Sequence, residues 1–234
     1  MSTIRPTRRI SRKERLREDT VATFYARALA FFDTNKRLVY GATVGVLVLL
    51  AALAGFSYLR AQNERSAADA IAAAVRSYEA GLHREALDGV TGNKGLLAVA
   101  DEYGSTRTGN LSRFYAADAL YRLGEYDEAL EYFRAYKKDS DYIGASALAG
   151  EANILQIQGK SAEAGRLYEQ AARLHEDAEF SPRYLMDAGR AYESVGDYAR
   201  AVQTYQRVEK EYPDAQVAAE AEFYIARASA RIVG

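Results

Sequence analysis

Hydrophobic side chains are concentrated in one uninterrupted stretch near the start of the chain. Residues 38–59, LVYGATVGVLVLLAALAGFSYL, contain no charged side chain. As a helix this run would be about 33 Å long, enough to cross a hydrocarbon core of about 30 Å. Arg37 and Arg60 flank it, and Tyr40 and Tyr58 lie near its ends, where interfacial aromatic residues are typical. The pattern predicts a single transmembrane helix over residues 38–59.

A cleaved signal peptide is the alternative interpretation of this run. Ala52-Leu53-Ala54 has the small-x-small form that signal peptidase prefers, and Arg8-Arg9 resembles a twin-arginine signal. A secretory signal, however, places its basic region directly against the apolar segment, whereas about thirty residues separate Arg9 from Leu38 here. The run is also longer than a typical signal-peptide core. Both differences favour a retained anchor.

The arm before the run, residues 1–37, shows a helical spacing of its own. Ser11 and Glu14 have the spacing of a capping box, so a helix is expected to begin there. Apolar residues then recur on one stripe, and basic residues are available for anionic lipid headgroups. The stripe consists of Val21, Phe24, Tyr25, Ala28, Leu29 and Phe32. We expect an amphipathic helix on the bilayer surface, and no nucleic-acid partner, because no groove-reading element or stacking platform accompanies the basic residues.

Within the predicted span, small residues recur every four positions. Gly41 and Gly45 form a GxxxG pair, and Ala51 and Gly55 repeat the spacing on a nearby face. Such pairs let two helices approach closely in a membrane. Contact with another membrane helix through Gly41 and Gly45 is therefore a hypothesis from the sequence, although small residues are common in membrane helices generally.

The remaining chain, residues 60–234, contains a repeated pattern in which a glycine is followed five residues later by an alanine. The four pairs are Gly81 and Ala86, Gly124 and Ala129, Gly159 and Ala164, and Gly196 and Ala201. Seven residues before each register glycine the side chain is small, at Ala74, Ala117, Ala152 and Gly189. Nine residues after the last three lie the aromatic residues Phe133, Tyr168 and Tyr205. Small residues let antiparallel helices cross at close range and the aromatic ring fills the next gap, which predicts a helical solenoid.

Charge is distributed unevenly along the chain. Residues 1–37 contain ten Lys or Arg and four Asp or Glu, and residues 60–234 contain 21 and 28. Because basic residues near a span stay on the cytoplasmic side, the arm is expected in the cytoplasm and residues 60–234 in the periplasm of a bacterial inner membrane. The absence of cysteine excludes disulfides, thiolate metal sites and a catalytic thiol.

Residue patterns that would indicate catalysis are weak. The segment GVTGNKG, residues 89–95, lacks the strand before it and the hydroxyl after its lysine that a phosphate-binding loop needs, so its glycines are expected to end one helix and admit another near Leu96. His83 and His175 have no partner at metal-ligand spacing. We therefore expect no enzyme, no cofactor and no metal.

The repeat resembles the tetratricopeptide repeat from about Asn110 to Pro213. The turns GEYDEAL and GDYARAV match that family, and the closest unit has Leu185, Gly189, Tyr192, Ala201, Tyr205 and Pro213 at its consensus positions. Asn110 and Ser181, which precedes Pro182, are placed as helix N-caps. The fold expected is all-α: an N-terminal amphipathic helix and one transmembrane helix, then a tetratricopeptide-like solenoid ending in a capping helix over residues 215–232.

The order of the segments also resembles a bacterial family of single-span inner-membrane proteins, the ancillary subunits of the Sec translocon. The likeness lies in FFDTNKRLVYG, the span, the alanine-rich SAADAIAAAVRSYEAG, and DEYGSTRTGN before the regular repeats. It implies a periplasmic scaffold that passes emerging proteins to folding factors, with translocon subunits or periplasmic chaperones as partners. A structural organiser of a cell-wall synthesis or division complex remains the alternative, since it needs only the same anchor and repeats.

In a tetratricopeptide-like solenoid the first helix of each pair lines the concave face. Relative to the register glycines, the inward positions lie ten, six and three residues earlier. They are Phe114, Asp118 and Tyr121, then Ala149, Asn153 and Gln156, then Met186, Arg190 and Glu193. This mixture predicts a groove for an extended peptide or a partner's helix, with Phe114, Tyr121 and Arg190 contributing most of the affinity. A face that is merely solvated, or filled by the terminal helix, is the competing interpretation.

Overall fold

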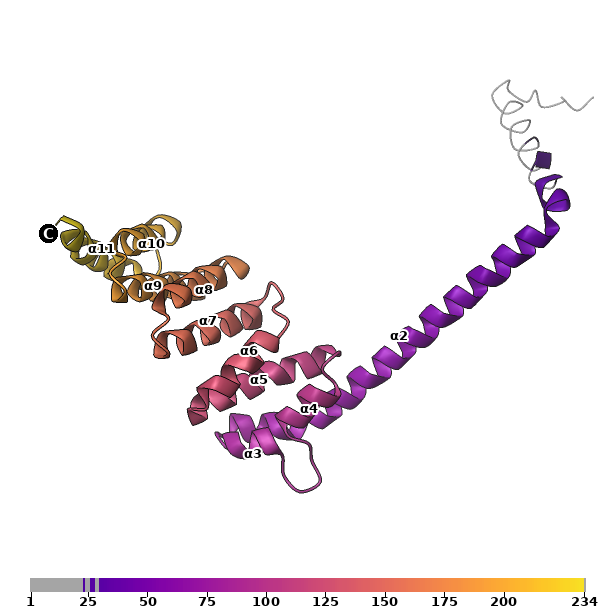
Figure 1. Ribbon diagram of the computed structural model, residues 1–234, viewed down its shortest axis with the longest axis horizontal. Coiled ribbons are helices and arrows are strands. Elements are labelled where there is room, and N and C mark those ends of the chain that lie inside the picture. Colours follow the sequence, from indigo (N-terminus) through magenta and orange to yellow (C-terminus); the bar gives the residue numbers. More distant parts are fainter. Residues whose placement is uncertain (1–22, 24–25, 28–29, 234) are drawn as a thin grey trace, which may run out of the picture. The chain divides into compact units, whose positions relative to one another are not determined.

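The computed structural model describes residues 23, 26–27 and 30–233, and its longest elements are all helices (Figure 1). The all-α prediction is confirmed, since no strand occurs in these ranges. The capping box of the arm and the stripe from Val21 to Leu29 lie outside the described residues. The helices are α2 (Lys36–Glu79), α3 (His83–Asp88), α4 (Leu96–Glu102), α5 (Arg107–Leu123), α6 (Tyr126–Ala135), α7 (Tyr142–Ile157), α8 (Ser161–Leu174), α9 (Phe180–Ser194), α10 (Tyr198–Glu211) and α11 (Ala218–Val233).

Helix α2 contains the apolar run, and it is the one helix in the described ranges that is long and apolar enough to cross a membrane. The side chains of the run are exposed or partly exposed throughout. The helix is longer than the apolar run and continues to Glu79. The polar side chains after Leu59 end the apolar run but not the helix, because arginine, glutamine and the alanines that follow all favour helix.

The chain divides into two compact units, residues 1–59 and 60–234, which are described separately. In the second unit the helices from α4 to α11 pack chiefly against their neighbours along the chain, whereas α3 packs more against α5 than against α4 (Figure 1). The pairs α5–α6, α7–α8 and α9–α10 correspond to the three regular repeats, and α11 packs on α10 and α9. The predicted solenoid with a terminal capping helix is confirmed.

The register glycines serve to turn the chain at the ends of helices. Their φ angles are 77° at Gly81, 82° at Gly124, 78° at Gly159 and 76° at Gly196. A Cβ at any of these four would meet nothing within 4 Å, so close packing does not explain them. Their left-handed backbone conformation explains them, because residues with a Cβ adopt this conformation only at a cost in free energy.

Close packing is instead found at the alanines and at glycines inside the helices. Ala129, Ala164 and Ala201 are 0% exposed, as predicted. A Cβ at Gly150 of α7 would lie within 2.8 Å of the Phe133 ring. At Gly165 a Cβ would lie 2.6 Å from the Tyr192 ring, and at Gly189 it would lie still closer to the Tyr205 ring. Rings from neighbouring helices therefore rest directly on glycine backbone.

Asn110, which the sequence suggested as a helix N-cap, is not the N-cap of α5. Its N-cap is Thr106, whose hydroxyl accepts a hydrogen bond from Gly109 N at 2.9 Å, so Asn110 lies inside the helix. Asn110 instead bonds the backbone of Lys137, accepting from its N–H at 2.8 Å and donating to its carbonyl at 3.0 Å. Glu64 of α2 accepts from the backbone N–H groups of Arg107 at 2.7 Å and Thr108 at 2.9 Å. Sequence spacing cannot show that another helix supplies these caps.

Helix α4 begins at Leu96, as predicted. The N-cap predicted for α9, Ser181, is wrong. Asp177, not Ser181, accepts from the first N–H groups of α9, those of Glu179 and Phe180, at 2.8 and 3.0 Å. Ser181 is buried, and its hydroxyl accepts from Asp177 N at 2.9 Å. The helix begins at Phe180 because the Asp177 carboxylate reaches its free N–H groups first.

Candidate functional site

Six of the predicted inward positions form a polar face along the first helices of the three regular repeats. They are Asp118 and Tyr121 on α5, Asn153 and Gln156 on α7, and Arg190 and Glu193 on α9. Asn153 and Gln156 are exposed, and the other four are partly exposed. We call these six residues the polar face.

The positions ten residues before each register glycine do not belong to this face. Met186 is 0% exposed and Ala149 is 8% exposed, so both lie in the core. Phe114 is partly buried, and its ring centroid lies 6.1 Å from that of Phe133 and 5.9 Å from that of Tyr136. This position points at the second helix of the pair, so Phe114 is unsuited to the role of groove anchor that the sequence suggested.

At the first repeat, Asp118 is held by two neighbours. Its Oδ2 accepts from the Tyr78 hydroxyl of α2 at 2.5 Å and from Arg122 Nε at 2.5 Å. Burial, followed by the hydrogen bond to Asp118, raises the pKa of Tyr78 to about 12. Because the carboxylate is already paired, this end of the polar face presents little free charge.

At the centre of the solenoid, two polar side chains of α7 meet the hydroxyl of Tyr168 on α8. The Tyr168 hydroxyl of α8 donates to Asn153 Oδ1 at 2.5 Å and also lies 3.3 Å from Gln156 Oε1. Burial is the main cause that raises the pKa of Tyr168, and nearby Asp187 and Tyr121 raise it further while Arg190 opposes them.

At the third repeat, the terminal helix contributes to the polar face. Arg190 pairs with Asp187 at 2.7 Å, and its guanidinium carbon lies 5.8 Å from the ring centroid of Tyr224 on α11. Glu193 accepts from the Tyr205 hydroxyl at 2.9 Å and pairs with Arg227. Burial, then the bond to Glu193, raises the pKa of Tyr205. The terminal helix therefore contacts the polar face at this repeat.

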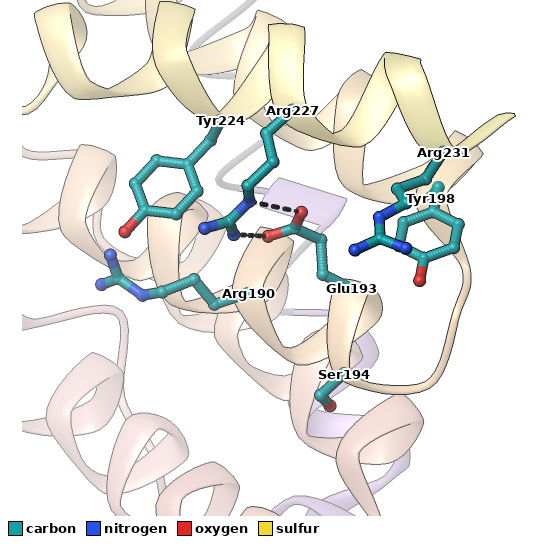
Figure 2. A pocket seen from close by; sticks show the side chains of 7 residues that line it. All are labelled: Arg190, Glu193, Ser194, Tyr198, Tyr224, Arg227 and Arg231. Atoms are coloured by element: carbon teal, nitrogen blue, oxygen red, sulfur yellow. Dashed lines mark hydrogen bonds and ion pairs between the residues drawn. The ribbon is translucent and has the colours of Figure 1, made fainter. Parts of the chain in front are cut away.

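Beside these contacts lies a cleft of about 540 Å³, which we call the α9–α11 cleft (Figure 2). It is lined by Arg190, Glu193, Ser194, Tyr198, Tyr224, Arg227 and Arg231. In Figure 2 Arg227 reaches across to Glu193, and Arg231 extends beside Tyr198. Arg190 is already paired with Asp187 and Arg227 with Glu193, whereas Arg231 has no ion pair in the described ranges. With the two aromatic rings, Arg231 suits a carboxylate-bearing segment of a polypeptide.

The polar face offers amide, hydroxyl and charged groups that can form hydrogen bonds. In the described ranges no group of three or more His, Cys, Asp or Glu side chains could hold a metal ion. Its carboxylates are already paired with tyrosine or arginine side chains. The exposed amides of Asn153 and Gln156 are hydrogen-bonding groups, not nucleophiles.

Sequence reasoning missed Tyr78, Tyr168 and Asp187 as parts of the face. Tyr168 was assigned to the core from its position nine residues after Gly159, and its ring is indeed buried. Only the hydroxyl reaches the polar side chains of α7. A buried tyrosine usually needs a partner for its hydroxyl, and that rule was the one available signal.

Taken together, these features define a helical repeat protein with a polar face along the first helices of its repeats. Residues 107–143 and 150–216 match the family model described as tetratricopeptide repeat, so these segments are tetratricopeptide repeats. The two matched segments thus carry repeats of a kind that forms protein-interaction scaffolds.

Among solved structures, the chain is similar to one described as a kinesin light chain of Podosopora anserina with nearly identical TPR-like repeats. The identity is 20%, the TM-score is 0.52, and the likeness covers 75% of this chain and 87% of the other. At this identity the likeness shows the fold. No curated protein matches the sequence.

Proposed function

We propose that this chain is a membrane-anchored scaffold that binds an extended polypeptide along its polar face. The observation that carries the proposal is the pair of exposed amides at the centre of that face. Asn153 Oδ1 and Gln156 Oε1 both face the Tyr168 hydroxyl. Their NH₂ groups therefore point elsewhere, and amide NH₂ groups donate well to the backbone carbonyls of an extended chain.

The α9–α11 cleft adds a second contact to the same proposal. Arg231 has no ion pair in the described part of the chain, and it lies in a cleft with Arg190 and Arg227. An acidic side chain or a terminal carboxylate of the bound segment would pair with this cluster. The ligand would then lie along the face, with its backbone over α7 and its charge at α9 and α11.

The membrane anchor is proposed from α2, whose apolar run has the length of a bilayer span. The charge asymmetry supports a cytoplasmic arm and a periplasmic solenoid, because residues 1–37 are basic and residues 60–234 are acidic. The resemblance in segment order supports a place among the ancillary Sec translocon proteins of the bacterial inner membrane. In that role the polar face would bind exported chains or the folding factors that receive them.

The test is site-specific photocrosslinking in intact membranes from the full chain. A photoreactive residue at Gln156 is compared with one at Gln170, an exposed glutamine on α8 with no hydrogen bond in the described ranges. Position 156 is expected to crosslink translocon subunits, exported chains or periplasmic folding factors, and position 170 is not.

Each alternative outcome decides something different. Crosslinks from position 156 to cell-wall synthesis or division enzymes would favour the organiser role instead. Equal profiles from positions 156 and 170 would show that the polar face is not the binding surface. Loss of the 156 crosslinks in Arg231→Gln, with the thermal midpoint unchanged, would place the ligand's carboxylate in the α9–α11 cleft.

A further inference from the structure

Four basic side chains from separate parts of the sequence surround a second cleft, of about 430 Å³. They are Arg60 of α2, Arg107 and Arg113 of α5, and Lys137 of the loop after α6. We call this the Arg60 cleft. Residues 60–234 as a whole are acidic, with 21 basic and 28 acidic side chains, so this concentration of cations runs against the average charge of the unit.

The guanidinium of one cation, and the backbone of a second, are held in place by specific contacts. Arg113 Nη1 donates to the carbonyl of Gly104 at 2.9 Å, and a Cβ on Gly104 would collide with this guanidinium. Lys137 is fixed through its backbone, because the Asn110 side chain bonds both its N–H and its carbonyl. The loops around the cleft are thus tied to α5, so part of the cleft is preorganised.

The acidic groups nearby offset only part of the positive charge, because four cations face two carboxylates, those of Asp139 and Glu64. Arg60, Arg107 and Lys137 have no ion pair in the described part of the chain. Glu64 is engaged with the backbone N–H groups of Arg107 and Thr108 and with the Thr108 hydroxyl. Asp139 is the one acidic residue among those lining the cleft. A net positive cleft with free guanidinium and ammonium donors suits a ligand with several anionic oxygens.

The position of Arg60 in the chain indicates where such a ligand would be. Arg60 is bonded to Leu59, the last residue of the apolar run. Interfacial regions add about 5–8 Å of polar headgroup to each side of the hydrocarbon core, so a residue directly after a span lies in that layer. Phosphate is the anionic group of that layer.

We propose that the Arg60 cleft binds the phosphate group of an anionic phospholipid headgroup. The choice of a lipid rests on the proposed membrane anchor, whereas the phosphate chemistry rests on the cleft alone. Arg113 and Lys137 are held beside α5 and Arg107 lies at its first turn, so a phosphate that enters can be bound from more than one side. Free inorganic phosphate is the other source of the same chemistry, and the experiment separates the two.

The experiment measures lipid binding to the purified full chain in a neutral detergent. Short-chain phosphatidylglycerol and short-chain phosphatidylcholine are titrated, and bound lipid is counted by native mass spectrometry, with inorganic phosphate and glycerol 3-phosphate as competitors. The test variant is Arg107→Gln with Lys137→Gln. The control, Arg166→Gln with Arg173→Gln, removes the same charge from exposed α8 side chains that have no ion pair in the described ranges.

We expect phosphatidylglycerol to bind more tightly than phosphatidylcholine, and the test variant to weaken it at least about tenfold while the control does not. Competition by millimolar inorganic phosphate with the same variant dependence would confirm the phosphate site and identify free phosphate as a ligand. Equal binding of the two lipids, or equal loss in both variants, would overturn the proposal. Carbonate extraction of wild-type membranes tests the anchor separately, so failure of the cleft and failure of the anchor are distinguishable.

Discussion

Replacing Gly189 by alanine is expected to destabilise the third repeat, although alanine is the better helix former. Gly189 lies in the middle of α9, where the exchange alone would stabilise by about 1 kcal/mol. The added Cβ, however, would stand 2.5 Å from Tyr205 Cζ and 2.7 Å from Cδ1. Ordinary van der Waals contact begins at 3.4 Å, so the ring must move by about 1 Å.

The ring has little freedom to move. Tyr205 is 0% exposed, its hydroxyl is bonded to Glu193 at 2.9 Å, and its centroid lies 5.3 Å from that of Tyr224. Overpacking at such a site costs about 3 kcal/mol, the upper end of the usual range, which leaves a net loss of about 2 kcal/mol. For a unit of this size the thermal midpoint should fall by about 4–8 °C.

The assay is thermal unfolding of the full chain in detergent, followed by circular dichroism at the helical minimum. Two controls separate the opposing effects. Ala226→Gly, at an exposed position of α11, measures helix propensity alone and should cost about 1 kcal/mol. In a Tyr205→Leu background the collision is relieved, so Gly189→Ala should become neutral or stabilising. A midpoint raised by Gly189→Ala in the wild-type background would refute the proposed packing.

Three further predictions use the same preparations. Ala201→Leu should lower the thermal midpoint, since Ala201 is 0% exposed and overpacking costs about 1–3 kcal/mol, whereas Ala199→Leu on the exposed side of α10 should change it little. The pKa of Glu64 is lowered, because hydrogen bonds from Thr108 and Arg107 outweigh burial. The contribution of Glu64 to stability is therefore present above the unfolded pKa near 4.5 and is lost as the pH falls through the lower folded pKa. In urea unfolding, the Glu64→Gln variant should be less stable than wild type at pH 7, and the difference in stability should shrink at acid pH. A reporter active only in the periplasm should work when fused after Gly234; activity that requires deletion of residues 38–59 would contradict the proposed topology.

Helix type and repeat register were predictable because they depend on local rules. The register glycines recur where each first helix must end in a left-handed residue, a requirement visible as spacing in the sequence. Asn153 and Gln156 were placed correctly on α7 because positions three apart share a helix face. Met186 was misplaced because it lies at the edge of such a face, which is about 100° wide or more. At this edge the side chain already meets the second helix of the pair and is buried.

Contacts between distant parts of the chain were not predictable from spacing. Glu64 binds α5 from a position more than forty residues earlier, and nothing near it in the sequence indicates its partner. The Arg60 cleft combines side chains from α2, α5 and the loop after α6, none of which forms a basic motif by itself. Asn110 is a residue type that often caps helices, but Thr106 lies at the actual start of α5. The side chain of Asn110 therefore hydrogen-bonds the backbone of Lys137 instead.

The helices of the second unit pack chiefly against their immediate neighbours, and this has a consequence for how the chain moves. In such an array the last element has a neighbour on one side only, so it can open without disturbing the rest. In the described ranges α11 packs only on α9 and α10, to which Arg227 and Tyr224 connect it. Amide hydrogen exchange should therefore be fastest at α11 and slower toward α7 and α8. Because α11 forms one wall of the α9–α11 cleft, the cleft can widen to admit a bulky segment while the central repeats keep their register.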